Sequence, residues 1–224
     1  MPTSQPQRPF QNILSRFGLS SGGSAAAIDG GTDCLILLDV STSMDANMSD
    51  GTPKLEAAKS ATIAISEERA RQDPRNRVAV LTYGDDARVE LNWQGGDGMV
   101  DTIQRGVRSI RTRGCTNIGA GLNQAATLLG AGNRPSLVFL LSDGCNNAGG
   151  DPEPLAQRLK QKGIYIATRG FGPAPNCVDV PLMMAMASTR HDGDPDYEFW
   201  EARSLGHIVE QARKVGRICL PSAS

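Results

Sequence analysis

Oxygen-bearing side chains gather at the ends of two apolar runs, and their spacing points to metal chemistry. Asp39, Ser41 and Ser43 occupy every second position at the end of the first long apolar run, and Asp143 follows a later one. Carboxylates and hydroxyls are hard oxygen ligands, which suit Mg²⁺ or Mn²⁺ and not zinc or copper. These residues supply fewer oxygens than Mg²⁺ requires, so water and an outside oxygen would complete its shell.

The elements that must position these residues can be predicted from the apolar pattern. Uninterrupted apolar runs at 34–40 and 137–141 suit strands that are buried on both faces of a parallel sheet. Residues 87–91 instead alternate after a tight turn, with Ala87, Val89 and Leu91 expected to point inward, which predicts an antiparallel edge strand. Further strands are expected at 77–83, 164–168 and 197–200, and helices at 53–72, 100–110, 119–129, 154–161, 178–187 and 203–215.

This alternation of strands and helices predicts an α/β fold, with an open, mostly parallel sheet between two layers of helices. In such sheets the ligand site lies beyond the carboxyl ends of the strands, which is where Asp39 and Asp143 should meet. The first helix is expected to begin with Thr52 as its N-cap and Pro53 in its first position.

Three motifs in this order resemble the von Willebrand factor type A (vWA) domain and its metal-ion-dependent adhesion site (MIDAS). They are Asp39-x-Ser41-x-Ser43, then Gly114-Cys115-Thr116-Asn117, then Leu140-Leu141-Ser142-Asp143-Gly144, and the likeness runs from about residue 31 to 217. The resemblance implies a Rossmann-like, six-stranded sheet of order 3-2-1-4-5-6 with an antiparallel third strand. It implies that the metal ligands are Asp39, Ser41, Ser43, Thr116 and Asp143.

The resemblance also implies a function. A Glu or Asp carboxylate of a partner protein fills the open position of a Mg²⁺ or Mn²⁺ ion, so the chain is expected to be an interaction module and not an enzyme. Candidate associates are an ATPase, a kinase or a phosphatase. Because Asp39 and Asp143 should lie in the crevice and not in the core, replacing either with alanine is expected to remove the metal and leave the fold.

Two alternatives remain open. One is a phosphatase or phosphotransferase of the haloacid dehalogenase type, in which a strand ends in Asp-x-Asp; here the second position is Ser41, which cannot act as the general acid. The other is a scaffold subunit that keeps the fold without using a metal. The two histidines, His191 and His207, suggest no catalytic triad.

The composition also limits the classes of partner that we expect the chain to bind. The chain carries 23 basic and 24 acidic residues and only 4% aromatic residues. This balance argues against a nucleic-acid or membrane-surface partner, which would need a basic excess. No apolar run approaches the roughly 18 residues of a membrane span.

The ends of the chain differ from its centre. Residues 1–30 are expected to form a disordered tail, either loose or with a short docking helix whose apolar face is Phe10, Ile13, Leu14 and Phe17; a transit peptide is a third interpretation. Residues 31–218 would form the vWA domain and 219–224 a C-terminal tail.

The cysteines indicate in which redox compartment of the cell the protein is expected. Five cysteines with no C-x-x-C and no secretory signal suggest free thiols in the cytoplasm. A disulfide between Cys34 and Cys219, which would imply secretion, is the alternative.

Overall fold

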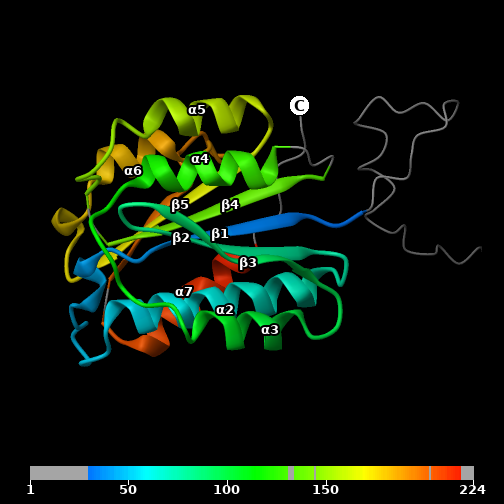
Figure 1. Cartoon of the computed structure of the whole chain (residues 1–224), viewed down its shortest axis with the longest axis horizontal. Helices are drawn as coiled ribbons and strands as arrows, with labels where there is room; N and C mark the ends of the chain where they lie inside the picture. The colour runs from blue at the N-terminus through cyan, green and yellow to red at the C-terminus, as the bar shows by residue number, and fades with distance from the viewer. Residues whose placement is uncertain (1–29, 131–133, 144, 202, 218–224) are drawn as a thin grey trace, which may run out of the picture.

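The computed structural model describes residues 30–130, 134–143, 145–201 and 203–217 (Figure 1). Residues 1–29 of the predicted N-terminal tail, the predicted C-terminal tail and Cys219 lie outside these residues. Within them, Cys34 is a free, fully buried thiol, and burial raises its pKa to about 12. None of the helices in these ranges has the length and hydropathy that a membrane span needs.

Six strands form one sheet in the order β3-β2-β1-β4-β5-β6 (Figure 1). Only the β2–β3 pair is antiparallel, and the other four pairs are parallel. This confirms the strand order, the mostly parallel sheet and the antiparallel third strand. The strands are β1 (Asp33–Asp39), β2 (Arg77–Tyr83), β3 (Ala87–Gly95), β4 (Ser136–Ser142), β5 (Tyr165–Gly172) and β6 (Tyr197–Glu201).

Helices cover both faces of the sheet, as expected (Figure 1). One layer contains α2 (Lys54–Gln72), α3 (Met99–Val107) and α7 (Leu205–Gly216); the other contains α4 (Ile118–Leu129), α5 (Glu153–Gln161) and α6 (Val180–Met186). A hydrophobic core lies on each face of the sheet, and successive residues of β1 point into opposite cores. Ile36 packs with the first layer of helices and Leu37 with the second. Short 3₁₀ turns, η2 (Thr42–Asp45) and η3 (Pro175–Cys177), follow β1 and β5.

Two local predictions are wrong. The N-cap of α2 is Pro53, not Thr52, and the helix begins at Lys54. In β3, Val89 is 37% exposed, and Ala87 and Leu91 pack against opposite core layers. The cause is a pair of register shifts around Val80 of β2, which reverse the side-chain alternation that the sequence pattern assumes.

Candidate metal centre

Asp39 ends β1 at the carboxyl edge of the sheet. Leu38 lies opposite Leu141 in the parallel pairing of β1 with β4, so the next residues of both strands, Asp39 and Ser142, end side by side. Oδ2 of Asp39 accepts a hydrogen bond from the Ser142 hydroxyl at 2.8 Å, and Oδ1 accepts one from the backbone N–H of Ser41 at 2.8 Å. Both carboxylate oxygens are therefore fixed by neighbours at the strand ends.

A chain of hydrogen bonds joins three of the predicted ligands. The hydroxyls of Ser41 and Ser43 lie 3.0 Å apart, and the Ser43 hydroxyl donates to Oδ1 of Asp143 at 2.8 Å. Ser43 is exposed, whereas Ser41 is 2% exposed. Hydrogen bonds thus connect the exposed Ser43 hydroxyl to the buried Asp143 carboxylate, directly after β4.

Thr116 reaches the same edge through a loop. Its backbone N–H donates to Oδ1 of Asn147 at 2.8 Å, and its carbonyl accepts from the Asn147 N–H at 3.0 Å. The loop also touches the η2 turn, because the Thr42 N–H donates to the Gly114 carbonyl at 3.1 Å. Among the described residues, no hydrogen bond joins the Thr116 hydroxyl to the other four predicted ligands.

A cation of the chain itself enters this cluster. The ammonium of Lys54 lies 2.5 Å from Oδ2 of Asp143, and the two side chains are 10% and 0% exposed. Lys54 is not among the residues predicted from the sequence. The available signal was its place in the first turn of a predicted helix, where the helix dipole disfavours a positive charge.

Both carboxylates are more deeply buried than predicted. Asp39 is 0% exposed and Asp143 is 3% exposed, whereas we expected both to lie in the crevice and not in the core. Burial, with a smaller contribution from the Asp143 carboxylate, raises the pKa of Asp39 to about 6, because desolvation penalises the charged form more than the hydrogen bonds from Ser41 and Ser142 favour it. An alanine at either carboxylate would leave buried hydrogen-bonding partners unsatisfied, so the fold would lose stability.

The donor set fits a hard divalent cation. It consists of two carboxylates and three hydroxyls, and such oxygen ligands suit Mg²⁺ and Mn²⁺. The described residues contain no group of three or more His, Cys, Asp and Glu side chains that could hold a metal. Most of the ligands of a site here would therefore be serine and threonine hydroxyls.

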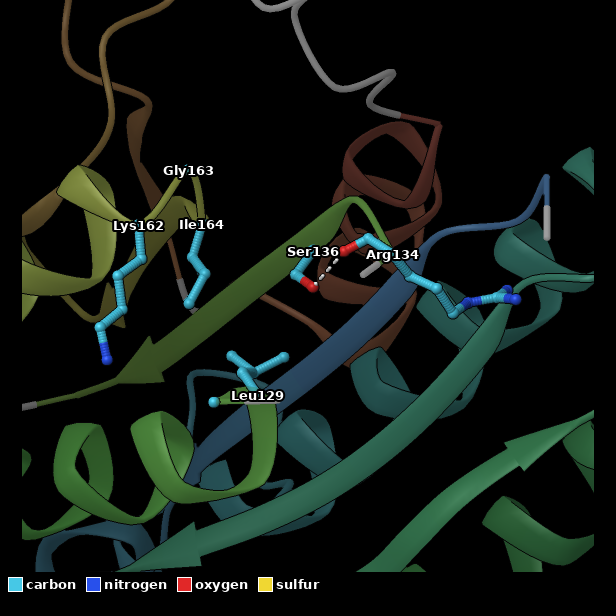
Figure 2. Close-up of a pocket in the computed structure, with 7 residues that line it drawn as sticks. Leu129, Arg134, Ser136, Lys162, Gly163 and Ile164 are labelled. Carbon is cyan, nitrogen blue, oxygen red and sulfur yellow. Dashed lines mark hydrogen bonds between the residues drawn. The ribbon is translucent and has the colours of Figure 1, made fainter. Parts of the chain in front are cut away.

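A separate pocket of about 300 Å³ lies at the opposite edge of the sheet (Figure 2). It is bounded by the start of β4 at Ser136 and the approach to β5 at Lys162 and Ile164. Its Arg134 side chain already pairs with Asp33 at 2.9 Å. The pocket contains none of the five predicted ligands.

The chain is similar to a known domain family. A model of the von Willebrand factor type A domain matches residues 34–146, just over half of the chain. The matched segment includes all five predicted ligands and Lys54. No curated protein matches the chain significantly.

Solved structures share the fold. A von Willebrand factor type A protein from Catenulispora acidiphila superimposes with a TM-score of 0.65 at 21% identity, covering 83% of this chain and 42% of that one. Proximal thread matrix protein 1 from the mussel byssus, whose MIDAS is occupied by zinc, has a TM-score of 0.66 at 24% identity, covering 83% and 46%. The chain therefore spans less than half of these two proteins.

A third structure is similar over nearly its whole length. The von Willebrand factor domain of the type V pili tip protein Mfa5 from Porphyromonas gingivalis has a TM-score of 0.63 at 11% identity, covering 83% of this chain and 95% of that one. At such identities the likeness establishes the fold alone.

Proposed function

The chain belongs to the von Willebrand factor type A domain family, and from this premise we propose that it binds an acidic residue of a partner protein through a divalent cation at a MIDAS. Domains of this family are typically interaction or adhesion modules. The observation that carries the proposal is the hydrogen-bonded cluster of Ser41, Ser43 and Asp143 beside Asp39 at the carboxyl edge of the sheet.

The proposed ligands are Asp39, Ser41, Ser43, Thr116 and Asp143. When bound, Mg²⁺ or Mn²⁺ would supply an electrophilic centre with a coordination position open to a partner carboxylate. Asp39 and Asp143 offset most of the charge of the ion, and the three hydroxyls add oxygens without adding negative charge. Ser142 and Asn147 support the set by fixing the Asp39 carboxylate and the Thr116 backbone.

Replacing one of the three hydroxyls with a carboxylate should change how the site attracts a partner. Ser43 is exposed, so an aspartate can replace it without burying a new charge. A third carboxylate would retain the ion and neutralise it, which would weaken the attraction to a partner carboxylate. Ser43→Asp should therefore separate metal binding from partner binding.

The test uses Mn²⁺ as the metal and a short oligoglutamate peptide as the partner probe. We expect the protein to raise the water-proton relaxation rate of Mn²⁺ solutions, and oligoglutamate to lower it again by displacing bound water. Oligoglutamine is the control peptide and should have no effect. Equal responses to the two peptides, or no response to Mn²⁺, would contradict the proposal. The titration is repeated with Mg²⁺ and Zn²⁺ as competitors, because a similar MIDAS holds zinc.

A cytoplasmic location is part of the proposal. It rests on the free thiol of Cys34 and on three exposed thiols, at Cys115, Cys145 and Cys177, which suit a reducing compartment. Fractionation of the source cells tests this, and recovery outside the cytoplasm would contradict it. The partner itself can be sought by affinity capture in Mg²⁺ and in EDTA, where an ATPase, kinase or phosphatase lost with EDTA would fit.

A further inference from the structure

Lys54 is a buried cation in an electrostatically unfavourable place. It is the first residue of α2, where the helix dipole repels positive charge, and it is only 8% exposed. A buried ammonium needs a partner, and its partner is the carboxylate of Asp143 at 2.5 Å. The position of Lys54 is therefore explained by Asp143 and not by the helix.

The loop before α2 holds Lys54 against the site. The Met48 N–H donates to the Thr52 carbonyl at 2.8 Å, which closes the loop between η2 and α2. The Lys54 N–H then donates to the Ala46 carbonyl at 3.0 Å, directly after η2. These backbone bonds bring the first turn of α2 next to the residues that follow Ser43.

Asp143 is consequently shared between two polar partners. Its Oδ1 accepts from the Ser43 hydroxyl at 2.8 Å and its Oδ2 accepts from the Lys54 ammonium. A divalent ion bound among these oxygens would either displace the ammonium or lie close to a like charge. Both possibilities weaken metal binding relative to a site without the lysine.

We propose that the Lys54 ammonium acts as a built-in competitor of the divalent cation, so that it stabilises the metal-free site and sets a higher metal concentration for loading. This inference rests on the proposed function, because it presumes that the cluster takes a divalent ion. It adds a residue outside the five ligands that tunes metal affinity. The competition requires only that the ammonium and the ion both interact with the Asp143 carboxylate, and it needs no change of fold.

The experiment compares Lys54→Met with Lys59→Met. Lys59 lies on the same helix and is also buried, at 4% exposed, but it pairs with the largely exposed Glu56 at 2.7 Å. Calorimetric titration with Mn²⁺ and with Mg²⁺ gives the affinities, and thermal melting with and without metal gives the stabilities. Circular dichroism checks that both variants fold.

We expect Lys54→Met to bind Mn²⁺ about tenfold more tightly than the wild type, the size of effect that removing one charge-assisted hydrogen bond implies. Without metal, the same variant should melt about 5 °C or more below Lys59→Met, because the buried Asp143 loses its cation. Added Mn²⁺ should then raise its melting temperature more than that of the wild type. Lys59→Met should match the wild type in affinity.

The possible results distinguish the inference from the proposed function. Binding to the wild type with unchanged affinity in Lys54→Met overturns the inference and leaves the proposed function. No binding to either protein overturns both. Binding only to Lys54→Met supports the competition and contradicts metal-dependent function in the wild type.

Discussion

The hydroxyl of Ser43 donates a hydrogen bond of 2.8 Å to Asp143, although the two residues are 100 positions apart in the chain. The bond exists because β1 and β4 are parallel neighbours whose carboxyl ends meet at one edge. It links the first and last motifs of the proposed metal site through a single exposed side chain.

Ser43→Ala tests this link. The variant should fold normally, since Ser43 is exposed, and should bind Mn²⁺ about tenfold more weakly, because it loses one proposed ligand and one hydrogen bond to Asp143. Thr42→Ala is the matched control on the same turn and should bind as the wild type does. The affinities come from calorimetry, and equal losses in both variants would argue against a specific role for Ser43.

Asn147→Ala tests how Thr116 is positioned. The side chain of Asn147 accepts the Thr116 N–H, so its loss should cost about 1 kcal/mol of unfolding free energy and lower metal affinity. Asn146 makes the corresponding bond to the Ile118 N–H at 2.9 Å and is the control. Asn146→Ala should lose similar stability, measured by urea unfolding, with less effect on affinity. The opposite order would contradict this role of Asn147.

Asp50 links the loop after the proposed site to the last helix. Its Oδ1 accepts the Thr52 N–H at 3.0 Å and its Oδ2 accepts the Leu205 N–H at 2.8 Å; these bonds lower the pKa of Asp50. Asp50→Ala should therefore speed hydrogen exchange of the Leu205 amide, while Ser49→Ala should not. Unchanged exchange in Asp50→Ala would mean that α7 is held without this bond.

Glu68 gives a prediction about acid stability. Burial alone would raise its pKa, but hydrogen bonds and charge from Arg217 and Arg71 lower it below the usual 4.5. A folded-state pKa below the unfolded value contributes stability above pH 4.5, and this is lost as the pH falls through the folded value. The stability advantage of the wild type over Glu68→Gln should therefore shrink below pH 4.5 in urea unfolding. A constant difference from pH 6 to pH 3 would contradict the prediction.

Much of the architecture could be predicted because its signals are local. Uninterrupted apolar runs marked β1 and β4, and the alternation of strands with helices gave the parallel sheet. The proximity of Asp39 and Asp143 could be predicted from topology alone, since they lie at the carboxyl ends of two parallel strands of one sheet. The motif resemblance added Thr116, which no local pattern places near the other residues.

The missed features depend on contacts between distant segments. Lys54 reaches Asp143 only because the loop after η2 folds back through backbone hydrogen bonds that carry no sequence signature. The exposure of Val89 follows from register shifts opposite Val80, which depend on how β2 and β3 pair. Asp39 is 0% exposed although it ends its strand, and residue types alone do not determine how deeply a side chain at a strand end is buried.

The central claim is that Asp39 and its neighbours bind a divalent cation. The most direct measurement is calorimetric titration of Mg²⁺ and Mn²⁺ into the wild type and Asp39→Asn, which preserves the shape of the buried side chain while removing its charge. We predict that the wild type takes up one divalent ion at millimolar or lower concentration and that the folded variant takes up none. No uptake by the wild type, or equal uptake by both proteins, would contradict the claim.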